Sequence, residues 1–253
     1  MTLRDVRDWV TITAEGFEGA FPSGAWSVFD NDGSTNGEYY WDDDDYKPHS
    51  GWWSAWAARG GANGLDPQDN YYSNNAQSWM VYGPFDLSDA SDAEILFYYW
   101  NQSELDYDWF GWSASTDCQH FYGYQVSGDS GGWKYKNFDL TAVPTIGNVT
   151  GDSSVCIAFI FTSDGSNVDD GPFVDDIVLQ KYVSSGQPNL TSYTPSGWDY
   201  PIVPSSVQGT YTVNQLCADQ STYVDWVVIN EGASTLTTFY STLYFDGSPV
   251  QTW

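Results

Sequence analysis

Residues 173–179 read Phe173-Val174-Asp175-Asp176-Ile177-Val178-Leu179, an apolar stretch with two carboxylates at its centre. Its aromatic and β-branched residues predict a strand. Alternation of successive side chains places Asp175 on the same face as Ile177 and Leu179, which we expect to face the core. A buried carboxylate is costly unless a cation meets it, and the chain has only 7 Lys and Arg against 34 Asp and Glu. A bound metal ion, Ca²⁺ in particular, is therefore the expected partner.

A second acidic motif, Phe17-Glu18-Gly19, lies near the start of the chain. A jelly roll brings its opening strand close to its closing strand, so Glu18 and Asp175 are the predicted ligands of a structural Ca²⁺. Asp176, on the opposite face of its strand, is the third predicted ligand, and backbone carbonyls and water would complete the shell. The alternative is that these acids are solvated or accept hydrogen bonds from nearby Tyr, Trp and backbone donors.

The composition indicates an all-β protein. The 253 residues include 14 Trp, 19 Tyr and 13 Phe, and no long apolar stretch has the period of a helix. The net charge of −27 argues against nucleic acid and anionic membranes as partners, because both carry phosphate charges that this surface repels. There is no transmembrane run, and the first eight residues do not form a signal peptide. If the protein is secreted, we expect this chain to be a fragment.

Short strand candidates alternate with turns rich in Gly, Asp, Asn and Pro, which is typical of a β-sandwich or jelly roll. In the first part of the chain the predicted strands are 78–82, 93–100, 109–115, 131–140, 154–162 and 177–182. The small, polar stretch that follows, ending at Pro188, predicts a linker at 183–187 between a jelly-roll domain of residues 9–182 and a second domain of residues 188–253.

The second domain is predicted to be a truncated immunoglobulin-like β-sandwich. Residues 222–230 and 239–245 are strand candidates, Asp246-Gly247 is a hairpin signal, and a return strand begins at Val250. A complete sandwich of this kind needs roughly 100 residues, and only the 66 residues 188–253 remain. We therefore expect an incomplete domain with an unpaired sheet edge.

The cysteines, Cys118, Cys156 and Cys217, have no metal-ligand spacing. An odd number leaves at least one thiol free or bonded to another chain. We expect unpaired, buried or half-buried thiols, with a Cys118–Cys156 disulfide as the alternative. Cysteine usage therefore says little about the compartment.

Several motifs recur together in a known family. They are Phe17-Glu18-Gly19 with Trp26-Ser27-Val28, Ser50-Gly51-Trp52-Trp53-Ser54, Trp79-Met80-Val81-Tyr82-Gly83-Pro84-Phe85-Asp86-Leu87, Ser115-Thr116-Asp117, Ser130-Gly131-Gly132-Trp133 and Phe173-Val174-Asp175-Asp176-Ile177. As a set they resemble the MAM-like jelly-roll module of secreted bacterial proteins, found in accessory regions of immune-inhibitor-A-type metallopeptidases and subtilisin-like proteases. The resemblance covers residues 14–182 and implies a structural ion between the opening and closing strands. Cys118 departs from it, because such modules often have Gly after Ser-Thr-Asp.

Residues 188–253 resemble a different family. Pro188-Asn189-Leu190-Thr191, Val224-Asp225-Trp226-Val227-Val228-Ile229-Asn230 and Leu243-Tyr244-Phe245-Asp246-Gly247 carry the resemblance. They are similar to the cell-adhesion-related bacterial domain (CARDB), an immunoglobulin-like β-sandwich. The two resemblances imply an extracellular setting and supply no ligand. No protease domain accompanies them, so peptidase activity is not implied.

The tryptophans Trp52, Trp53 and Trp56, with Trp41 nearby, are candidates for a sugar-stacking platform. Alternation places Trp52 and Trp56 on one face and Trp53 on the other, so at least one face is expected to be core. Large exposed aromatic surface would favour binding, and full burial would remove it.

The other acidic stretches are read as ordinary loops. Asp30-Asn31-Asp32-Gly33 resembles the start of an EF-hand loop, but Trp41 stands where that loop needs Glu, so a turn is predicted and a second Ca²⁺ loop is the alternative. Asp42-Asp43-Asp44-Asp45 predicts a solvated acidic loop rather than a ligand cluster.

Catalysis has little support in the sequence. Gly128-Asp129-Ser130-Gly131-Gly132 resembles the surroundings of a chymotrypsin-type serine, but neither His49 nor His120 stands in the setting that such an enzyme needs. We predict a turn at this stretch and no enzyme activity.

We therefore predict an all-β chain, a jelly-roll β-sandwich followed by a truncated immunoglobulin-like β-sandwich. Its predicted function is that of a non-catalytic extracellular accessory or adhesion module in a larger secreted bacterial protein such as a protease. Its predicted partners are an extracellular protein or glycan ligand and adjacent domains of the same polypeptide, and its location is secreted or at the cell surface. The alternatives are a carbohydrate-binding module and a purely structural spacer.

Overall fold

The computed structural model describes residues 7–184, 190–213, 216, 219–230, 242–245 and 248–252. The chain divides into two compact units, one of Trp9–Val183 and the other of Met1–Asp8 with Ser184–Trp253. Every regular element in the described ranges is a strand, as the composition predicted. Within those ranges no helix is long and apolar enough to cross a membrane.

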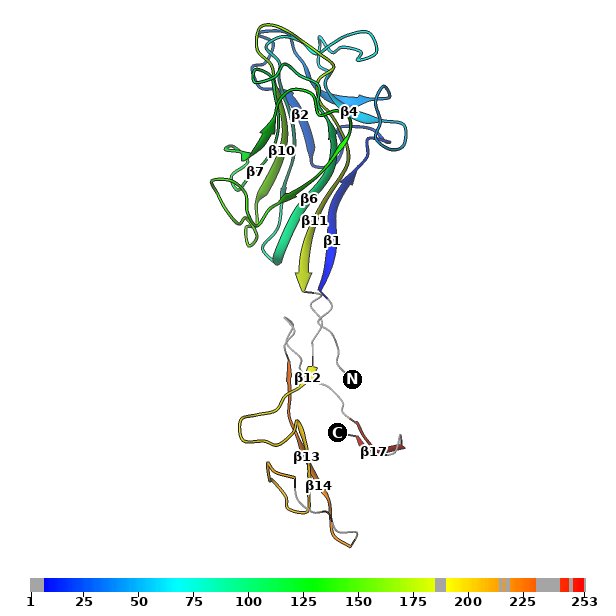
Figure 1. The fold of residues 1–253 in the computed structure, drawn as a ribbon, viewed down its shortest axis with the longest axis vertical. Helices are drawn as coiled ribbons and strands as arrows, with labels where there is room; N and C mark the ends of the chain where they lie inside the picture. Colours follow the sequence, from blue (N-terminus) through cyan, green and yellow to red (C-terminus); the bar gives the residue numbers. More distant parts are fainter. Residues whose placement is uncertain are drawn as a thin grey trace. The chain divides into compact units, whose positions relative to one another are not determined.

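The first unit is a sandwich of two sheets (Figure 1). One sheet has the strand order β3-β4-β11-β6-β9, with β1 also paired to β11. Its strands are β1 Arg7–Glu15, β3 Tyr40–Asp44, β4 Ser54–Gly60, β6 Ala90–Trp100, β9 Lys134–Asp139 and β11 Phe173–Ser184. Figure 1 shows β1, β11 and β6 side by side. The opening and closing strands of the unit therefore lie together, as the jelly-roll pattern predicted.

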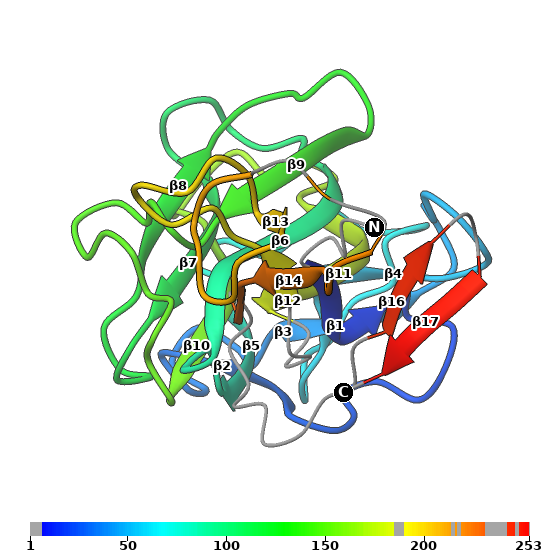
Figure 2. The same ribbon diagram turned by 90° about the horizontal axis from the view of Figure 1, so that it is seen from below.

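The other sheet has the order β2-β5-β10-β7-β8. Its strands are β2 Trp26–Asp30, β5 Gln77–Phe85, β7 Trp109–Ser115, β8 Tyr122–Val126 and β10 Val155–Thr162. In Figure 2, β10, β7 and β8 follow one another along one side of the sandwich. All five strands predicted between residues 78 and 162 are present, and 109–115 has the predicted bounds.

Aromatic rings fill the space between the sheets. Phe97 of β6 meets Phe159 of β10 edge to face, with ring centroids 4.9 Å apart, and Phe110 and Trp112 of β7 complete the centre. These four side chains are at most 1% exposed. Each such ring contributes roughly 1.5–3 kcal/mol by burial, so the alternation of apolar residues along β6, β7 and β10 accounts for the stacking of the two sheets.

The described residues of the second unit form three two-stranded sheets. The strands are β12 Leu190–Ser192 with β15 Val228–Asn230, β13 Ile202–Ser205 with β14 Tyr223–Trp226, and β16 Thr242–Phe245 with β17 Ser248–Thr252. The predicted hairpin between 239–245 and a return strand agrees with the β16–β17 pair, although Asp246 and Gly247 themselves lie outside the described residues. The immunoglobulin-like assignment stays a prediction.

The predicted linker begins two residues too early. β11 continues through Ser184, because Val183 still pairs with Ala90 of β6. Residues 185–187 lie outside the described ranges.

The expectation of unpaired thiols is wrong for two of the cysteines. Cys118 and Cys156 form a disulfide with their Cα atoms 5.3 Å apart. Strand register explains the pairing: Ser115 at the end of β7 lies opposite Cys156 of β10, and the turn that follows, with Cys118 at φ 56°, returns over that strand. Cys217 lies outside the described residues.

Candidate functional site

Glu18 holds the loop of residues 45–53, which connects β3 to β4. Its Oε1 accepts the backbone N–H groups of Trp52 at 2.6 Å and of Trp53 at 3.0 Å. Gly51 adopts φ 62°, and a Cβ atom there would overlap the Glu18 carboxylate. The carboxylate and the glycine are therefore fitted to each other.

Asp175 and Asp176 hold the same loop at His49 and Ser50, just before the residues that Glu18 holds. Asp175 Oδ2 accepts the N–H groups of His49 at 2.8 Å and Ser50 at 3.1 Å. Asp176 lies 2.7 Å from His49 Nδ1 through Oδ2 and accepts the Ser50 hydroxyl through Oδ1. The His49 ring in turn stacks on Tyr98 of β6, with centroids 3.6 Å apart. The three predicted acids thus share one role, which is to accept hydrogen bonds from residues 49–53.

The predicted face of Asp175 is wrong. The register with β6 shifts between Asp175 and Val178, and Asp176 adopts φ 51°, so a β-bulge interrupts the alternation. Asp175 therefore lies opposite Tyr98, on the face of the sheet turned away from Ile95 and the core. It is still fully buried, because the 45–53 loop covers it. Burial raises the pKa of its carboxyl, and the N–H donors of Ser50, Asp176 and His49 oppose that rise.

These geometries do not fit one ion held by all three acids. Glu18, Asp175 and Asp176 do not bring one oxygen each within 4.8 Å of one another. The aspartate oxygens already accept hydrogen bonds. The alternative stated from the sequence, hydrogen bonding to backbone donors, is therefore what the structure shows at this place. Ca²⁺ binding by these residues stays a prediction.

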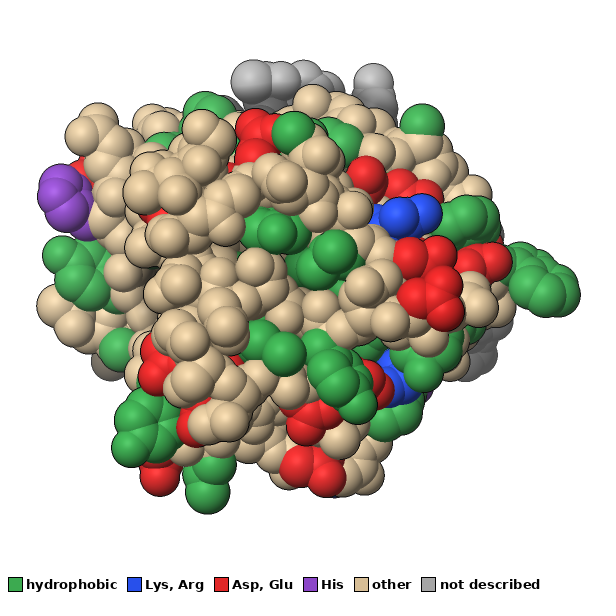
Figure 3. Space-filling model, turned by 90° about the horizontal axis from the view of Figure 1, so that it is seen from above, with side chains coloured by type: hydrophobic (Ala, Val, Ile, Leu, Met, Phe, Trp, Pro, Cys, Tyr) green, Lys and Arg blue, Asp and Glu red, His purple; other side chains and the backbone are tan. Residues whose placement is uncertain are grey.

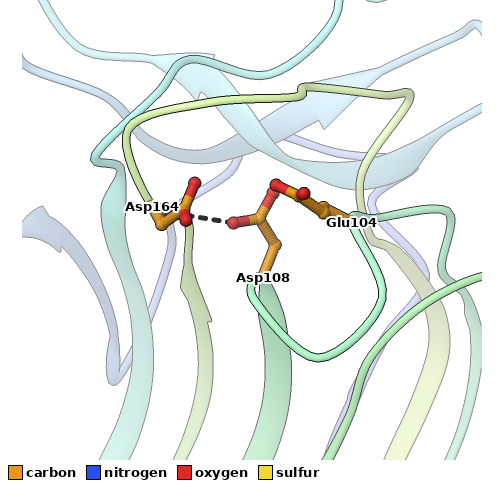
Figure 4. A group of neighbouring side chains, drawn as sticks. All are labelled: Glu104, Asp108 and Asp164. Carbon is orange, nitrogen blue, oxygen red and sulfur yellow. Dashed lines mark hydrogen bonds between the residues drawn. The ribbon is translucent and has the colours of Figure 1, made fainter.

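Another acidic cluster does converge. Glu104, Asp108 and Asp164 bring carboxylate oxygens within 4.8 Å of one another (Figure 4). Asp108 is fully buried and accepts the Asp164 N–H at 2.7 Å and the Tyr72 hydroxyl at 2.5 Å. Glu104 Oε2 is buried and has no hydrogen-bond partner. These residues could hold a metal ion. Sequence reasoning missed them because Glu104 and Asp108 lie in the loop between β6 and β7, whereas Asp164 follows β10, far along the chain.

The electrostatics of this cluster are unfavourable without a cation. Burial raises the pKa of Asp108, the hydrogen bonds from Tyr72 and Asp164 oppose the rise, and the charges of Asp164 and Glu104 add to it. None of the five ion pairs within the described residues involves this cluster.

Of the four tryptophans predicted as a sugar-stacking platform, two are buried and two are exposed. Trp41 and Trp56 are fully buried, so neither ring can stack on a sugar. Trp41 contacts Phe110 in the core and donates to the Ser78 carbonyl, and Trp56 donates to the Asp170 carbonyl at 2.6 Å. Trp52 and Trp53 are 78% and 36% exposed on the 45–53 loop. Figure 3 shows one face of the protein, on which carboxylates and hydrophobic side chains are scattered among other groups and Lys and Arg are sparse.

Of the two other acidic stretches, one has the predicted structure and the other does not. Asp30–Gly33 forms a turn, as predicted: Asp32 donates its N–H to the Asp30 side chain and Gly33 to the Asp30 carbonyl. The prediction of a solvated loop at 42–45 is wrong, because Tyr40–Asp44 is strand β3. Asp44 is buried and pairs with Arg59 at 2.8 Å. Burial raises the pKa of the Asp42 carboxyl to about 6, helped by the charge of Asp43.

The serine-protease arrangement is absent at Ser130. Its hydroxyl donates to the Gly132 carbonyl at 2.7 Å and accepts the Asn101 N–H at 3.1 Å. His49 is engaged by Asp176, and His120 bonds Asp117 at 2.8 Å in its own turn. Neither described histidine therefore activates this serine.

A groove crosses the outer face of the five-stranded sheet. Gly111 of β7, Ile160 of β10 and Gln125 of β8 lie in one register row on that face, away from the core residues Phe110 and Phe159. The groove encloses about 230 Å³. Its lining residues are Trp109, Gly111, Trp112, Ser113, Phe121, Gly123, Tyr124, Gln125, Ile160 and Thr162. None of the ten is charged, although the chain carries a net charge of −27.

Further aromatic rings extend this face. Trp79 of β5 lies opposite Ile160, contacts Phe121 edge to face at 5.6 Å, and stacks with the 39% exposed Phe29 of β2 at 5.9 Å. The groove residues gave no sequence signal of their own, because a strand pattern does not distinguish an outer aromatic face from a core face.

No protein-family model matches the sequence, and no curated protein matches it either. Among solved structures, the K3 cleaved adhesin domain of Lys-gingipain from Porphyromonas gingivalis is 15% identical, covers 67% of this chain and 98% of that chain, and gives a TM-score of 0.46. The K1 adhesin domain of the same protein is 14% identical over 66% and 96%, with a TM-score of 0.44. A family 11 carbohydrate-binding module from Clostridium thermocellum, in complex with a β-1,3-1,4-mixed-linked tetrasaccharide, is 16% identical over 65% and 92%, with a TM-score of 0.38.

Proposed function

We propose that this chain is a non-catalytic extracellular binding module that holds a neutral carbohydrate chain in the groove on the outer face of its five-stranded sheet. The observation that carries the proposal is the charge-free, aromatic lining of that groove on a strongly acidic protein. Aromatic rings receive the apolar faces of sugar rings, and a few polar groups fix their orientation.

The groove supplies both kinds of contact. Trp109 and Phe121 are half-buried rings at its sides, and Thr162, Ser113 and Gln125 offer hydroxyl and amide groups to sugar hydroxyls. Gly111 carries no side chain on its floor, so a ligand can approach the backbone of β7. A neutral ligand suits this lining, because an anionic ligand would also be repelled by the net negative charge of the protein.

An extracellular location is supported by the disulfide between Cys118 and Cys156. Disulfides persist in oxidising compartments and are rare in the cytosol. As part of the same proposal we keep the MAM-like and CARDB-like identities, the place within a larger secreted protein, and a structural Ca²⁺. The convergent carboxylates of Glu104, Asp108 and Asp164 are the better candidates for that ion, because the predicted Glu18, Asp175 and Asp176 do not bring their oxygens together.

A glycan array with the purified chain tests the proposal, followed by calorimetry with the best neutral oligosaccharide. Trp109→Ala and Phe121→Ala should each weaken binding at least tenfold while thermal unfolding stays cooperative. Trp52→Ala and Trp53→Ala are the matched controls, because they remove exposed tryptophans from the 45–53 loop and should leave affinity unchanged.

Two results would overturn the proposal that the groove binds the carbohydrate. One is loss of binding in the Trp52 or Trp53 variants alone, which would assign the sugar to the loop. The other is no glycan binding together with capture of a defined extracellular protein, which would favour the protein-binding adhesion module predicted from the sequence.

A further inference from the structure

A second cleft opens where the two sheets separate at their β8 and β9 edges. It encloses about 420 Å³ and is lined by Tyr99, Asn101, Val126, Ser127, Gly128, Asp129, Ser130, Lys134, Tyr135 and Lys136. It shares no lining residue with the groove on the outer sheet face. Its occupancy can therefore be tested separately from the proposed function.

The lysines of this cleft stand out because of how the other cations are used. Among the described side chains, Lys47 pairs with Asp170, Arg59 with Asp44 and Lys181 with Asp89. Lys134 and Lys136 form no ion pair or side-chain hydrogen bond with any described residue. In a chain with 34 acidic and 7 basic residues, two lysines without a carboxylate partner are unexpected.

Strand register places both lysines on the inner face of the sandwich edge. Lys134 of β9 lies opposite Tyr99 of β6, and Lys136 lies opposite Phe97, whose ring is in the core. Residues directly opposite each other in adjacent strands have their Cβ atoms about 5 Å apart on one face. The Lys136 ammonium lies 5.0 Å from the centroid of the buried Trp112 ring, which confirms that this side chain lies along the inner face.

Tyr99 adds a hydroxyl between the lysines and the core. Its ring contacts Phe110 and Trp112 with centroids 5.6 Å away, and no hydrogen bond engages its hydroxyl within the described residues. Burial raises the pKa of Tyr99, so the hydroxyl stays protonated and can donate. Asp129 is the one acid in the lining, and its Oδ1 accepts the Gly131 N–H at 2.7 Å. The cleft therefore has two lysines against one aspartate.

We propose that this cleft binds the carboxylate of an acidic sugar, with Lys134 and Lys136 as the cationic contacts and Tyr99 as a hydroxyl donor. Ammonium groups meet a carboxylate with charge-assisted hydrogen bonds, which are the strongest that such a site offers. The long-range field of the protein opposes anions, so the two lysines must act at contact distance.

The rest of the lining favours a sugar over an acidic peptide. Val126 is the single aliphatic side chain among the ten lining residues, so there is no apolar pocket for peptide side chains. The Tyr135 ring lies opposite Tyr98, on the other face of β9 from the lysines, and does not enter the cleft. The neighbouring Tyr124, opposite Trp112 on the inner face, is 53% exposed, and such a ring can stack on a sugar. Lys136 lines both this cleft and the adjoining one that contains Tyr124.

Calorimetry with trigalacturonate and its fully methyl-esterified form tests the proposal. The ester keeps the rings and hydroxyls and removes the charge. We expect the acid to bind at least tenfold more tightly than the ester, and Lys134→Gln with Lys136→Gln to remove that preference. Lys136→Arg should keep it, because Arg retains both the charge and the contact with the Trp112 ring. Lys181→Gln is the control for net charge, since Lys181 pairs with Asp89 outside the cleft.

Equal binding of acid and ester, or an unchanged preference in the double lysine variant, would overturn the proposal. Equal affinity for a short Asp/Glu peptide would overturn its sugar component and assign the cleft to acidic protein segments. The Trp109→Ala and Phe121→Ala variants separate the two sites: they should leave the binding of trigalacturonate unchanged.

Discussion

The carboxylate of Glu18 accepts the backbone N–H of Trp52 at 2.6 Å, across 34 residues of chain. This bond and its partner to Trp53 fix the end of the 45–53 loop. Glu18→Ala should lower the free energy of unfolding by about 1 kcal/mol, because hydrogen bonds to a charged acceptor contribute about 1.5–3 kcal/mol and these two are exposed. Hydrogen exchange followed by mass spectrometry should show faster exchange at residues 50–53.

The matched control is Glu38→Ala. The Glu38 carboxylate accepts the backbone N–H of Ala62 in a different loop, so the variant removes a bond of the same kind elsewhere. It should leave exchange at 50–53 unchanged. Unaltered exchange at residues 50–53 in the Glu18 variant would contradict the prediction and show that Asp175 and Asp176 are enough to hold the loop.

The disulfide predicts a large loss of stability on removal. Cys118 and Cys156 are 38 residues apart, and closing a loop of that size stabilises the folded chain by about 4 kcal/mol in the chain-entropy description. The Cys118→Ser/Cys156→Ser double variant should therefore be about 3–4 kcal/mol less stable in urea, and reductant should lower the stability of the wild type by a similar amount. A reductant effect of equal size in the double variant would refute this origin.

The strands of the first unit could be predicted because their signals are local. Alternating apolar runs and glycine- or aspartate-rich turns mark β5, β6, β7 and β10. The aromatic and β-branched residues of 173–179 predict the closing strand β11. The face of Asp175 could not be predicted, because one bulge residue at Asp176 shifts the register and reverses every side chain before it.

The sites were harder to predict for two physical reasons. A tryptophan in a strand looks the same in sequence whether it faces the core, as Trp41 of β3 does, or the outer face of its sheet, as Trp79 of β5 does. Contacts between distant loops, such as Glu104 with Asp164 or the 45–53 loop with Asp175, depend on the sheet order and leave no spacing in the sequence.

Asp42 should make the protein less stable at neutral pH. Burial raises the pKa of its carboxyl from 3.8 to about 6 in the folded chain. Between these values the folded state keeps a proton that the unfolded state has released, so stability falls as pH rises through this range. Asp42→Asn removes the ionisation, and its Oδ1 can still accept the Asp43 N–H.

The Asp42→Asn variant should therefore gain about 1 kcal/mol over the wild type at about pH 7.5 and almost nothing at about pH 3.5. Urea unfolding at the two pH values measures the difference. Asp45→Asn is the control, since Asp45 is exposed in the adjoining loop and should show no such dependence. A gain of the same size at both pH values would mean that the effect is not one of ionisation.

Glu104 should destabilise the chain when no cation is present. Its Oε2 is buried without a partner beside the carboxylates of Asp108 and Asp164. In EDTA, Glu104→Gln should raise the free energy of unfolding by about 1 kcal/mol, because it removes one like charge and its amide can donate to a neighbouring carboxylate. Asp106→Asn, an exposed residue of the same loop, makes the same change in net charge and should have little effect. If Ca²⁺ binds this cluster, millimolar Ca²⁺ should stabilise the wild type more than Glu104→Gln and reverse their order. A variant less stable than the wild type in EDTA would show that Glu104 acts through its hydrogen bond from the Asn167 amide, and not through repulsion.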